Sequence, residues 1–320
     1  MRLFDPNDIG PSTAEAEPEP EPEPEEPDAP APAVPELRAA APTGPLCRIR
    51  LLVAYDGAPF HGFAFQPGQP TVAGRLTEVL ERVAGHAVTL TCAGRTDSGV
   101  HAGGQVVHAD VAEGFFEAFA DRERLIRSLT HQVAPEVAVL DVQRAPDCFD
   151  ARRSALSRRY RYLLLRSTGP NPLWRHMTWH VPGPLDVPAM RLAADTLLGE
   201  RDFSAFCRRP PDGGSLVRRV MHAAVVPEPE HHLLRFEIEA NAFCHQMVRS
   251  IVGAIVSVGE GRLTAAAVLE MLRSGDRSRG SRLAPPGGLC LESVRYPPDL
   301  VPGGVWLPPN GSSSENRAAP

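Results

Sequence analysis

Proline and glutamate dominate the first part of the chain and limit how much of it can fold. Residues 15–45 consist largely of Glu-Pro and Ala-Pro units and offer almost no large apolar side chain for burial. Such a segment cannot bury enough apolar surface to offset the entropy of ordering it. We therefore predict a disordered acidic tail over residues 1–46.

The other end of the chain is similar in composition. After Pro297 the sequence runs into Pro, Gly and Ser, with Val305, Trp306 and Leu307 as the candidates for docking. We predict a second disordered tail over residues 298–320. What remains is long enough for two ordinary domains.

The charge of the chain changes once the acidic tail is set aside. The whole sequence has a formal net charge of −6, but residues 1–46 contain 11 acidic and 2 basic side chains. The remaining residues contain 31 basic and 28 acidic side chains, which gives +3. Every basic residue is arginine. The absence of lysine excludes Schiff-base and P-loop chemistry, whereas guanidinium groups suit contacts with phosphate.

Several other classes of protein are disfavoured by simple patterns. The opening residues lack a charged and then apolar leader, and no apolar stretch is long enough to span a bilayer, so we predict a cytoplasmic protein. Six cysteines lie far apart without a C-x-x-C motif, which predicts buried, unpaired thiols with neither a zinc site nor a disulfide framework. We expect no metal and no nucleotide cofactor.

Hydrophobic periodicity predicts two consecutive units of strands and helices. The first unit has expected strands at 48–55, 88–92, 105–110 and 137–143 and helices at 71–84 and 122–132. The second has expected strands at 158–165, 177–181, 219–226, 233–240 and 290–295 and helices at 188–198, 243–258 and 264–273. This order favours an α+β fold of two ferredoxin-like or RRM-like units whose antiparallel sheets share a central cleft. The boundary near residues 146–153 divides the chain into domains 47–148 and 149–297.

The loop over residues 93–102, Ala-Gly-Arg-Thr-Asp-Ser-Gly-Val-His-Ala, links two expected strands and carries the first candidate for chemistry. Two glycines, a threonine and Asp97 are typical of a tight, exposed turn. A loop of this kind is usually only an Asx-type turn with a solvated arginine. Asp97 is nevertheless a candidate nucleophile.

Arg249 is the second candidate, because it is the only formal charge between Glu239 and Glu260. The surrounding apolar residues predict a buried helix, and a buried guanidinium needs a partner. That partner is either a loop carboxylate such as Asp97 or the carbonyl groups of a helix end.

The segment Arg158-Arg159-Tyr160-Arg161-Tyr162 is the third candidate. Strand alternation places both tyrosines on one face and Arg159 and Arg161 on the other. The tyrosines either offer a stacking surface for a nucleic-acid base or are core aromatics beside a solvated basic face.

Three long motifs together resemble the TruA family of tRNA pseudouridine synthases. They are G-R-T-D-S-G-V-H-A at 94–102, R-R-Y-R-Y at 158–162 and N-A-F-C-H-Q-M-V-R-S-I-V-G at 241–253. The resemblance covers roughly residues 48–297, with shorter matches such as Gly288-Leu289-Cys290-Leu291. Ala73 and Phe63-Ala64 depart from the residues common in the family.

The resemblance implies a role for five residues. Asp97 is the nucleophile that attacks the ribose or the base, and Arg249 keeps it charged and aimed. Tyr160 packs against the target base or removes its C5 proton. Arg95 stabilises the flipped-out state of the uridine, and Leu289 lines the uracil pocket.

The resemblance also implies a substrate and an assembly. Family members act on uridines 38, 39 and 40 in the anticodon stem-loop of tRNA, without a cofactor and as homodimers. Two other functions remain open on the residues alone, a non-catalytic RNA-binding module and a hydrolase or nuclease that uses Asp97 as acid or metal ligand. The second would want further clustered carboxylates or an H-E-x-x-H signature, which the sequence lacks.

Overall fold

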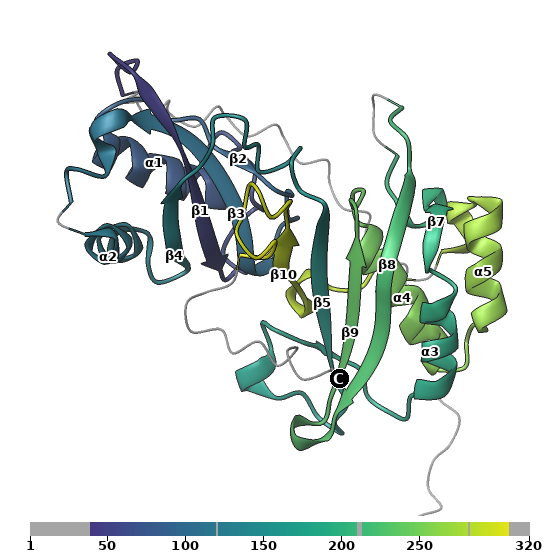
Figure 1. Ribbon diagram of the computed structural model, residues 1–320. Coiled ribbons are helices and arrows are strands. Elements are labelled where there is room, and N and C mark those ends of the chain that lie inside the picture. The colour runs from purple at the N-terminus through teal and green to yellow at the C-terminus, as the bar shows by residue number, and fades with distance from the viewer. Residues whose placement is uncertain (1–38, 120, 210–212, 281, 307–320) are drawn as a thin grey trace, which may run out of the picture. The chain divides into compact units, whose positions relative to one another are not determined.

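The computed structural model describes residues 39–119, 121–209, 213–280 and 282–306 (Figure 1). Its strands are β1 (Leu46–Tyr55), β2 (Thr91–Cys92), β3 (His101–Ala112), β4 (Val137–Arg144), β5 (Ser157–Leu165), β6 (Trp179–His180), β7 (Gly199–Asp202), β8 (Val217–Glu228), β9 (Leu233–Ala240) and β10 (Leu289–Arg295). Its α-helices are α1 (Val72–Ala84), α2 (Arg122–Val133), α3 (Val187–Asp195), α4 (Met247–Gly259) and α5 (Ala265–Ser274). The predicted α+β class is confirmed. None of the helices in these ranges is long and apolar enough to cross a membrane.

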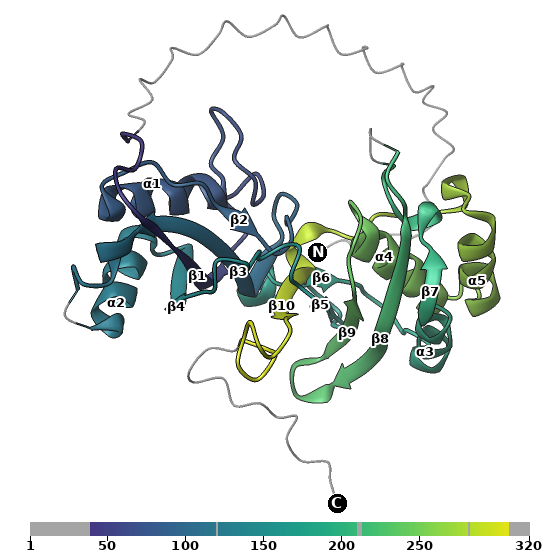
Figure 2. The same ribbon diagram turned by 45° about the horizontal axis from the view of Figure 1, so that its top comes forward.

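All ten strands belong to one sheet, with the order β4-β1-β3-β10-β5-β9-β8-β7 and with β2 on β3 and β6 on β5. We expected two antiparallel sheets that share a central cleft, and the structure corrects this to one continuous sheet. The last strand in the chain, β10, pairs in parallel with β3 and antiparallel with β5, so it joins the strands of both halves. Figures 1 and 2 show β10 between them, with α1 and α2 beside the first half and α3, α4 and α5 beside the second. The domain boundaries stay a prediction.

Local signals explain where several helices begin. The Thr71 hydroxyl accepts a hydrogen bond from the backbone N–H of Gly74, so Thr71 caps α1, which begins at Val72, one residue after the predicted start. Helix α4 begins at Met247 and not, as predicted, at 243, because Gln246 has a positive φ of 66°. Residues 241–244 are therefore irregular, and a turn at residues 245–246 precedes the helix.

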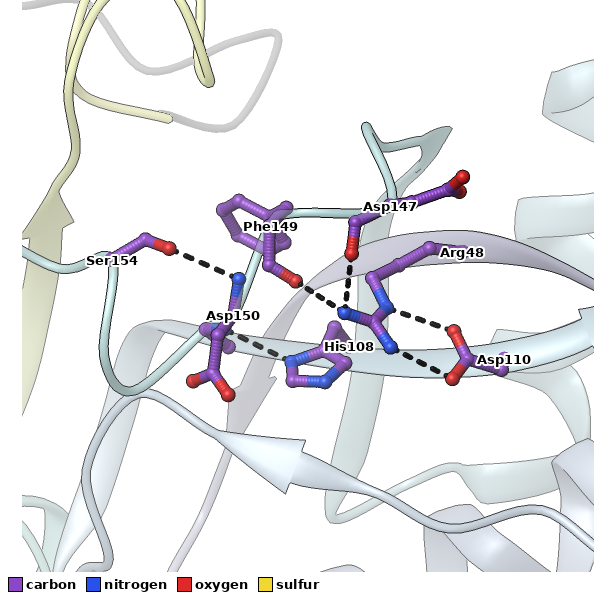
Figure 3. A network of polar contacts seen from close by, with 8 residues as sticks. Arg48, His108, Asp110, Asp147, Phe149, Asp150 and Ser154 are labelled. Carbon is purple, nitrogen blue, oxygen red and sulfur yellow. Dashed lines mark hydrogen bonds and ion pairs between the residues drawn. The ribbon is translucent and has the colours of Figure 1, made fainter.

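The segment between the two halves is fastened to the first one (Figure 3). Arg48 on β1 makes a two-pronged contact with Asp110 on β3, at 2.8 Å for both bonds. Its third nitrogen donates to the backbone carbonyls of Asp147 and Phe149 at 2.8 and 3.0 Å. His108 completes the contact, because its Nδ1 accepts a hydrogen bond from the N–H of Ala151 at 2.9 Å. Burial lowers the pKa of His108, which favours the neutral ring that this acceptor role requires.

The prediction of a disordered C-terminal tail is wrong over residues 298–306. Residues 298–306 pack on the first half of the sheet, where the indole N–H of Trp306 donates to Asp141 at 2.8 Å. The Arg50 guanidinium lies 5.0 Å from the centre of the Trp306 ring, and Val301 is buried. These contacts explain why a proline-rich stretch is ordered here. Leu307 and the rest of this tail, and residues 1–38 of the acidic tail, lie outside the described residues.

Gly104 allows β10 to lie against β3, and this gives a first prediction. A Cβ atom at Gly104 would lie 2.2 Å from the carbonyl oxygen of Glu292 on β10, whereas one at its neighbour Gly103 meets nothing within 4 Å. We expect Gly104→Ala to lower the free energy of unfolding by about 1–3 kcal/mol, because the strands must move apart. Gly103→Ala is the matched control and should change it by less than about 0.5 kcal/mol. Chemical denaturation measures both, and equal stabilities for the two variants would contradict the close approach.

The contact between Arg48 and Asp110 gives a second prediction, on pH. The hydrogen bonds from Arg48 lower the pKa of Asp110 in the folded protein. A lowered carboxyl pKa stabilises the fold above the pKa of the unfolded chain, about 3.9, and this contribution is lost as the pH falls through the folded value. The stability difference between wild type and Asp110→Asn should therefore be nearly constant from pH 7 to about 5 and shrink as the pH falls from about 4 towards about 2. A difference that stays constant down to about pH 2 would contradict it.

Candidate active site

The loop that carries Asp97 is held by hydrogen bonds from three segments of the chain. The Tyr55 hydroxyl on β1 bonds to the Thr96 hydroxyl at 2.8 Å, and Gln105 on β3 donates to the carbonyl of Gly94 at 2.8 Å. The N–H of Phe63 donates to the carbonyl of Thr96 at 3.1 Å. The backbone on both sides of Arg95 is thus fixed, while the side chain of Arg95 is exposed.

His101, from the same motif, has a structural role. Its Nε2 lies 2.7 Å from the carbonyl of His176, and its Nδ1 lies 3.0 Å from the N–H of Gly57. The first contact needs a donor and the second an acceptor, so the ring is the neutral tautomer with its proton on Nε2. The approach of Asp56 to Nδ1 at 3.1 Å is therefore not an ion pair. His101 joins the loop over residues 57–63 to the segment before β6.

Asp97 lies between two side chains that can carry positive charge. Its Oδ2 is 3.6 Å from Nη1 of Arg249, and its Oδ1 is 3.6 Å from Nε2 of His245. The Arg249 side chain is 14% exposed and that of Asp97 is 28% exposed. Arg249 also donates from Nε to the carbonyl of Ala284 at 2.8 Å, so it has both a carboxylate and a carbonyl partner. The sequence prediction that Asp97 and Arg249 lie together is confirmed.

His245 is a site residue that the sequence reasoning missed. It precedes Arg249 by four residues in the quoted motif, which was the available signal. Its backbone carbonyl accepts a hydrogen bond from the N–H of Arg208 at 3.1 Å. Its neighbour Cys244 forms a disulfide with Cys207, with 5.8 Å between the Cα atoms. The turn before α4 is therefore tied to the segment that follows Phe206.

That disulfide corrects the prediction of six unpaired cysteines. Cys207 and Cys244 are 37 residues apart, and only the return of β8 and β9 brings them together. Cys47, Cys92, Cys148 and Cys290 are free. No group of three or more potential metal ligands occurs among the residues that the structure describes.

Tyr160 on β5 is buried beside Asp97 and Arg249. The centre of its ring lies 5.0 Å from that of Phe243, and the two ring planes make an angle of 81°. Burial raises the pKa of Tyr160 above its ordinary value, and the nearby Asp97 carboxylate adds to the shift. Tyr162 is fully buried and donates to the carbonyl of Pro285 at 2.7 Å. Tyr162 is thus a core aromatic, and only Tyr160 remains a candidate for contact with a base.

The arginines on the opposite face of β5 form ion pairs and are not simply solvated. Arg159 contacts Glu237 on β9 at 2.7 Å, and Arg161 contacts Glu292 on β10 at 3.4 Å. The predicted alternation of tyrosine and arginine faces is confirmed. These two arginines are engaged with carboxylates on the neighbouring strands.

Leu289 begins β10 directly opposite Tyr162, and it is buried. The structure therefore brings together Asp97, Arg249 and His245, and it places Tyr160 beside Asp97. Arg95 extends outward from the same loop. A carboxylate held between an arginine and a histidine next to an aromatic ring suits nucleophilic attack on a flat, uncharged substrate group.

Arg158 is a second residue that the sequence reasoning did not assign, and it positions the loop. Its guanidinium is buried and donates to the carbonyl of Ala93 at 2.8 and 3.2 Å. It also donates to the carbonyls of Arg152 at 2.6 Å, Asn241 at 2.8 Å and Ala155 at 3.2 Å. Burial lowers its pKa, but a guanidinium remains charged at neutral pH.

Comparison with known proteins agrees with this geometry. Residues 193–297 match a family model described as tRNA pseudouridine synthase. A tRNA pseudouridine synthase A from Frankia casuarinae is 47% identical over 80% of this chain and 92% of its own length. One from Methylobacterium radiotolerans is 41% identical over 78% of this chain and 98% of its own length.

One similarity to a solved structure is more distant. An H/ACA RNP bound to a substrate RNA containing 2'-deoxyuridine matches with 13% identity and a TM-score of 0.28, over 65% of this chain and 44% of that one. That similarity is too low to add weight. The sequence relatives decide the matter, because they are similar over nearly their whole length: the chain belongs to the tRNA pseudouridine synthase family.

Proposed function

We propose that this isomerase converts uridine to pseudouridine at positions 38, 39 and 40 in the anticodon stem-loop of tRNAs, with Asp97 as nucleophile and without a cofactor. The observation that carries the proposal is the Asp97 carboxylate, held between Arg249 and His245 at 3.6 Å from each. Membership in the family supplies the reaction and the tRNA substrate. We further propose that the enzyme is cytoplasmic and acts as a homodimer.

A carboxylate suits this reaction because it is first a nucleophile and later a leaving group. Asp97 attacks either the ribose C1′ or the base C6, and the bond between C1′ and N1 breaks. The uracil turns, a bond forms between C1′ and C5, and the electron pair of the bond to Asp97 returns to the carboxylate. C5 loses one proton and N1 gains one, so atoms and electrons balance without an oxidant or reductant.

The environment of Tyr160 supports one of its two suggested roles. Because burial raises the pKa of Tyr160, its hydroxyl is protonated at neutral pH. A protonated phenol is a poor acceptor for the C5 proton, but its ring can pack against a base. We assign Tyr160 this packing role, supported from the side by Phe243.

Access to the target requires that the uridine leave its stack, at a cost of a few kcal/mol. The exposed Arg95, two residues before Asp97, is suited to occupy the space that the uridine vacates. Leu289 gives the uracil an apolar surface. The alternative of a non-catalytic RNA-binding module leaves the pairing of Asp97 with Arg249 without a purpose, since phosphates repel carboxylates.

Replacement of the nucleophile tests the proposal directly. We expect Asp97→Asn to lower the rate of pseudouridine formation by at least about a thousandfold, because the amide cannot act as nucleophile. Release of tritium from C5-labelled uridine in tRNA measures the rate. Affinity for tRNA should stay within about threefold, since phosphate contacts remain.

Asp147→Asn is the matched control for this experiment. Its side chain is exposed and points away from the Arg48 network in Figure 3, so this variant should react at the wild-type rate. Appreciable turnover by Asp97→Asn would exclude Asp97 as nucleophile and would favour the binding module.

The partner of the nucleophile gives a second test. Arg249→Leu removes the guanidinium beside Oδ2, and we expect a loss of about 100-fold or more in single-turnover rate. Arg249→Lys keeps the charge but not the planar donor set that also reaches Ala284, and it should recover part of the rate. Arg273→Leu, at an exposed position on α5, is the control. Wild-type rates in Arg249→Leu would show that the pair has no part in the reaction.

A further inference from the structure

The two oxygens of Asp97 face different partners, and only one of these was expected. Oδ2 faces Arg249, which is nearly buried, whereas Oδ1 faces His245, whose side chain is 47% exposed. His245 therefore lies on the open side of the carboxylate. A substrate that approaches Asp97 from solvent meets the oxygen beside His245.

The backbone of His245 is fixed more firmly than its exposure suggests. Arg208 donates to its carbonyl at 3.1 Å, and the disulfide between Cys207 and Cys244 holds the residue before it. The residue after it, Gln246, ends the turn with a positive φ, and Met247 then donates to the carbonyl of Cys244 at 3.1 Å. The imidazole thus extends toward Asp97 from a turn that is held on both sides.

The proposed chemistry of Asp97 would use a hydrogen-bond donor at the position of the His245 imidazole. Arg249 engages Oδ2, so Oδ1 is the oxygen that is free to attack. When the bond between the substrate and the carboxylate breaks again, its electron pair returns to this oxygen. An N–H donor beside Oδ1 stabilises the returning charge and fixes the rotation of the carboxylate. The 3.6 Å separation closes to hydrogen-bond distance with a shift of less than about 1 Å, and catalytic contacts commonly shorten on substrate binding.

We propose that His245 is a positioning residue for Asp97. Its imidazole N–H donates a hydrogen bond to Oδ1, which aims the carboxylate for attack and stabilises it as it departs. This inference rests on the proposed role of Asp97 as nucleophile. The competing role for a half-exposed histidine is a contact with an RNA phosphate, which would act on tRNA affinity and not on the chemical step.

Three variants of the full-length protein separate these roles. His245→Phe keeps a ring but removes the N–H donor, His245→Gln keeps a donor, and His245→Gly opens a space that added imidazole can fill. His131→Phe is the control, because His131 is an exposed histidine on α2. Each variant is assayed for its single-turnover rate at saturating enzyme, its affinity for tRNA and its thermal unfolding.

We expect His245→Phe to lower the single-turnover rate by about 10- to 100-fold, a fraction of what a fully buried donor contributes. The dissociation constant for tRNA should change by less than about threefold. His245→Gln should recover at least half of the loss on a logarithmic scale, and imidazole should raise the rate of His245→Gly. Rescue by imidazole is a response that a purely structural residue would not give.

Two results would overturn the inference. One is a wild-type single-turnover rate in His245→Phe. The other is weaker tRNA binding in both His245→Phe and His245→Gln with an unchanged rate at saturation, which would assign His245 to the RNA. Asp97→Asn is assayed alongside: activity in that variant refutes the proposed function itself, whereas an inactive Asp97→Asn with a fully active His245→Phe refutes only the role of His245.

Discussion

The arrangement of the site depends on the hydrogen bonds that the buried guanidinium of Arg158 donates to backbone carbonyls. It bonds to carbonyls from three separate segments: the entry to the Asp97 loop, the linker between the two halves, and Asn241 before the turn that carries His245. A buried cation without full hydrogen bonding would be strongly unfavourable, so these carbonyls must converge on it. The direction of the Asp97 loop is thereby coupled to the position of its partners.

The second constraint is the insertion of the last strand into the middle of the sheet. Strand β10 pairs with β3 on one side and with β5 on the other, so neither half has a free edge where they meet. The same strand begins with Leu289 opposite Tyr162, and its Glu292 contacts Arg161 on β5 at 3.4 Å. Residues 298–306 then return over β1 and β4 through Trp306. Residues 289–306 thus join the two halves of the sheet and then pack on the first half.

The sequence predicted those features that depend on residues close together in the chain. The apolar surroundings of Arg249 required a partner, strand alternation separated the tyrosines from the arginines around Tyr160, and Thr71 marked the start of α1. The remaining features depend on contacts that no local pattern contains. The place of β10 and the docking of Trp306 on Asp141, 165 residues away, are set by topology. His245 was missed because an expected helix over 243–258 left no turn before Met247, and the disulfide that fixes this turn joins residues 37 apart.

Asp97 and its two partners come from different halves of the chain, and this joins folding to the proposed chemistry. Asp97 lies on a loop of the first half, while Arg249 and His245 precede or begin a helix of the second. Arg249 is the less exposed member of its pair, so it loses more hydration on burial and needs the carboxylate more than the carboxylate needs it. Docking of the loop therefore relieves an unfavourable buried cation. The same contact orients Asp97, so the interaction that favours assembly of the two halves also aims the carboxylate that we propose as the nucleophile.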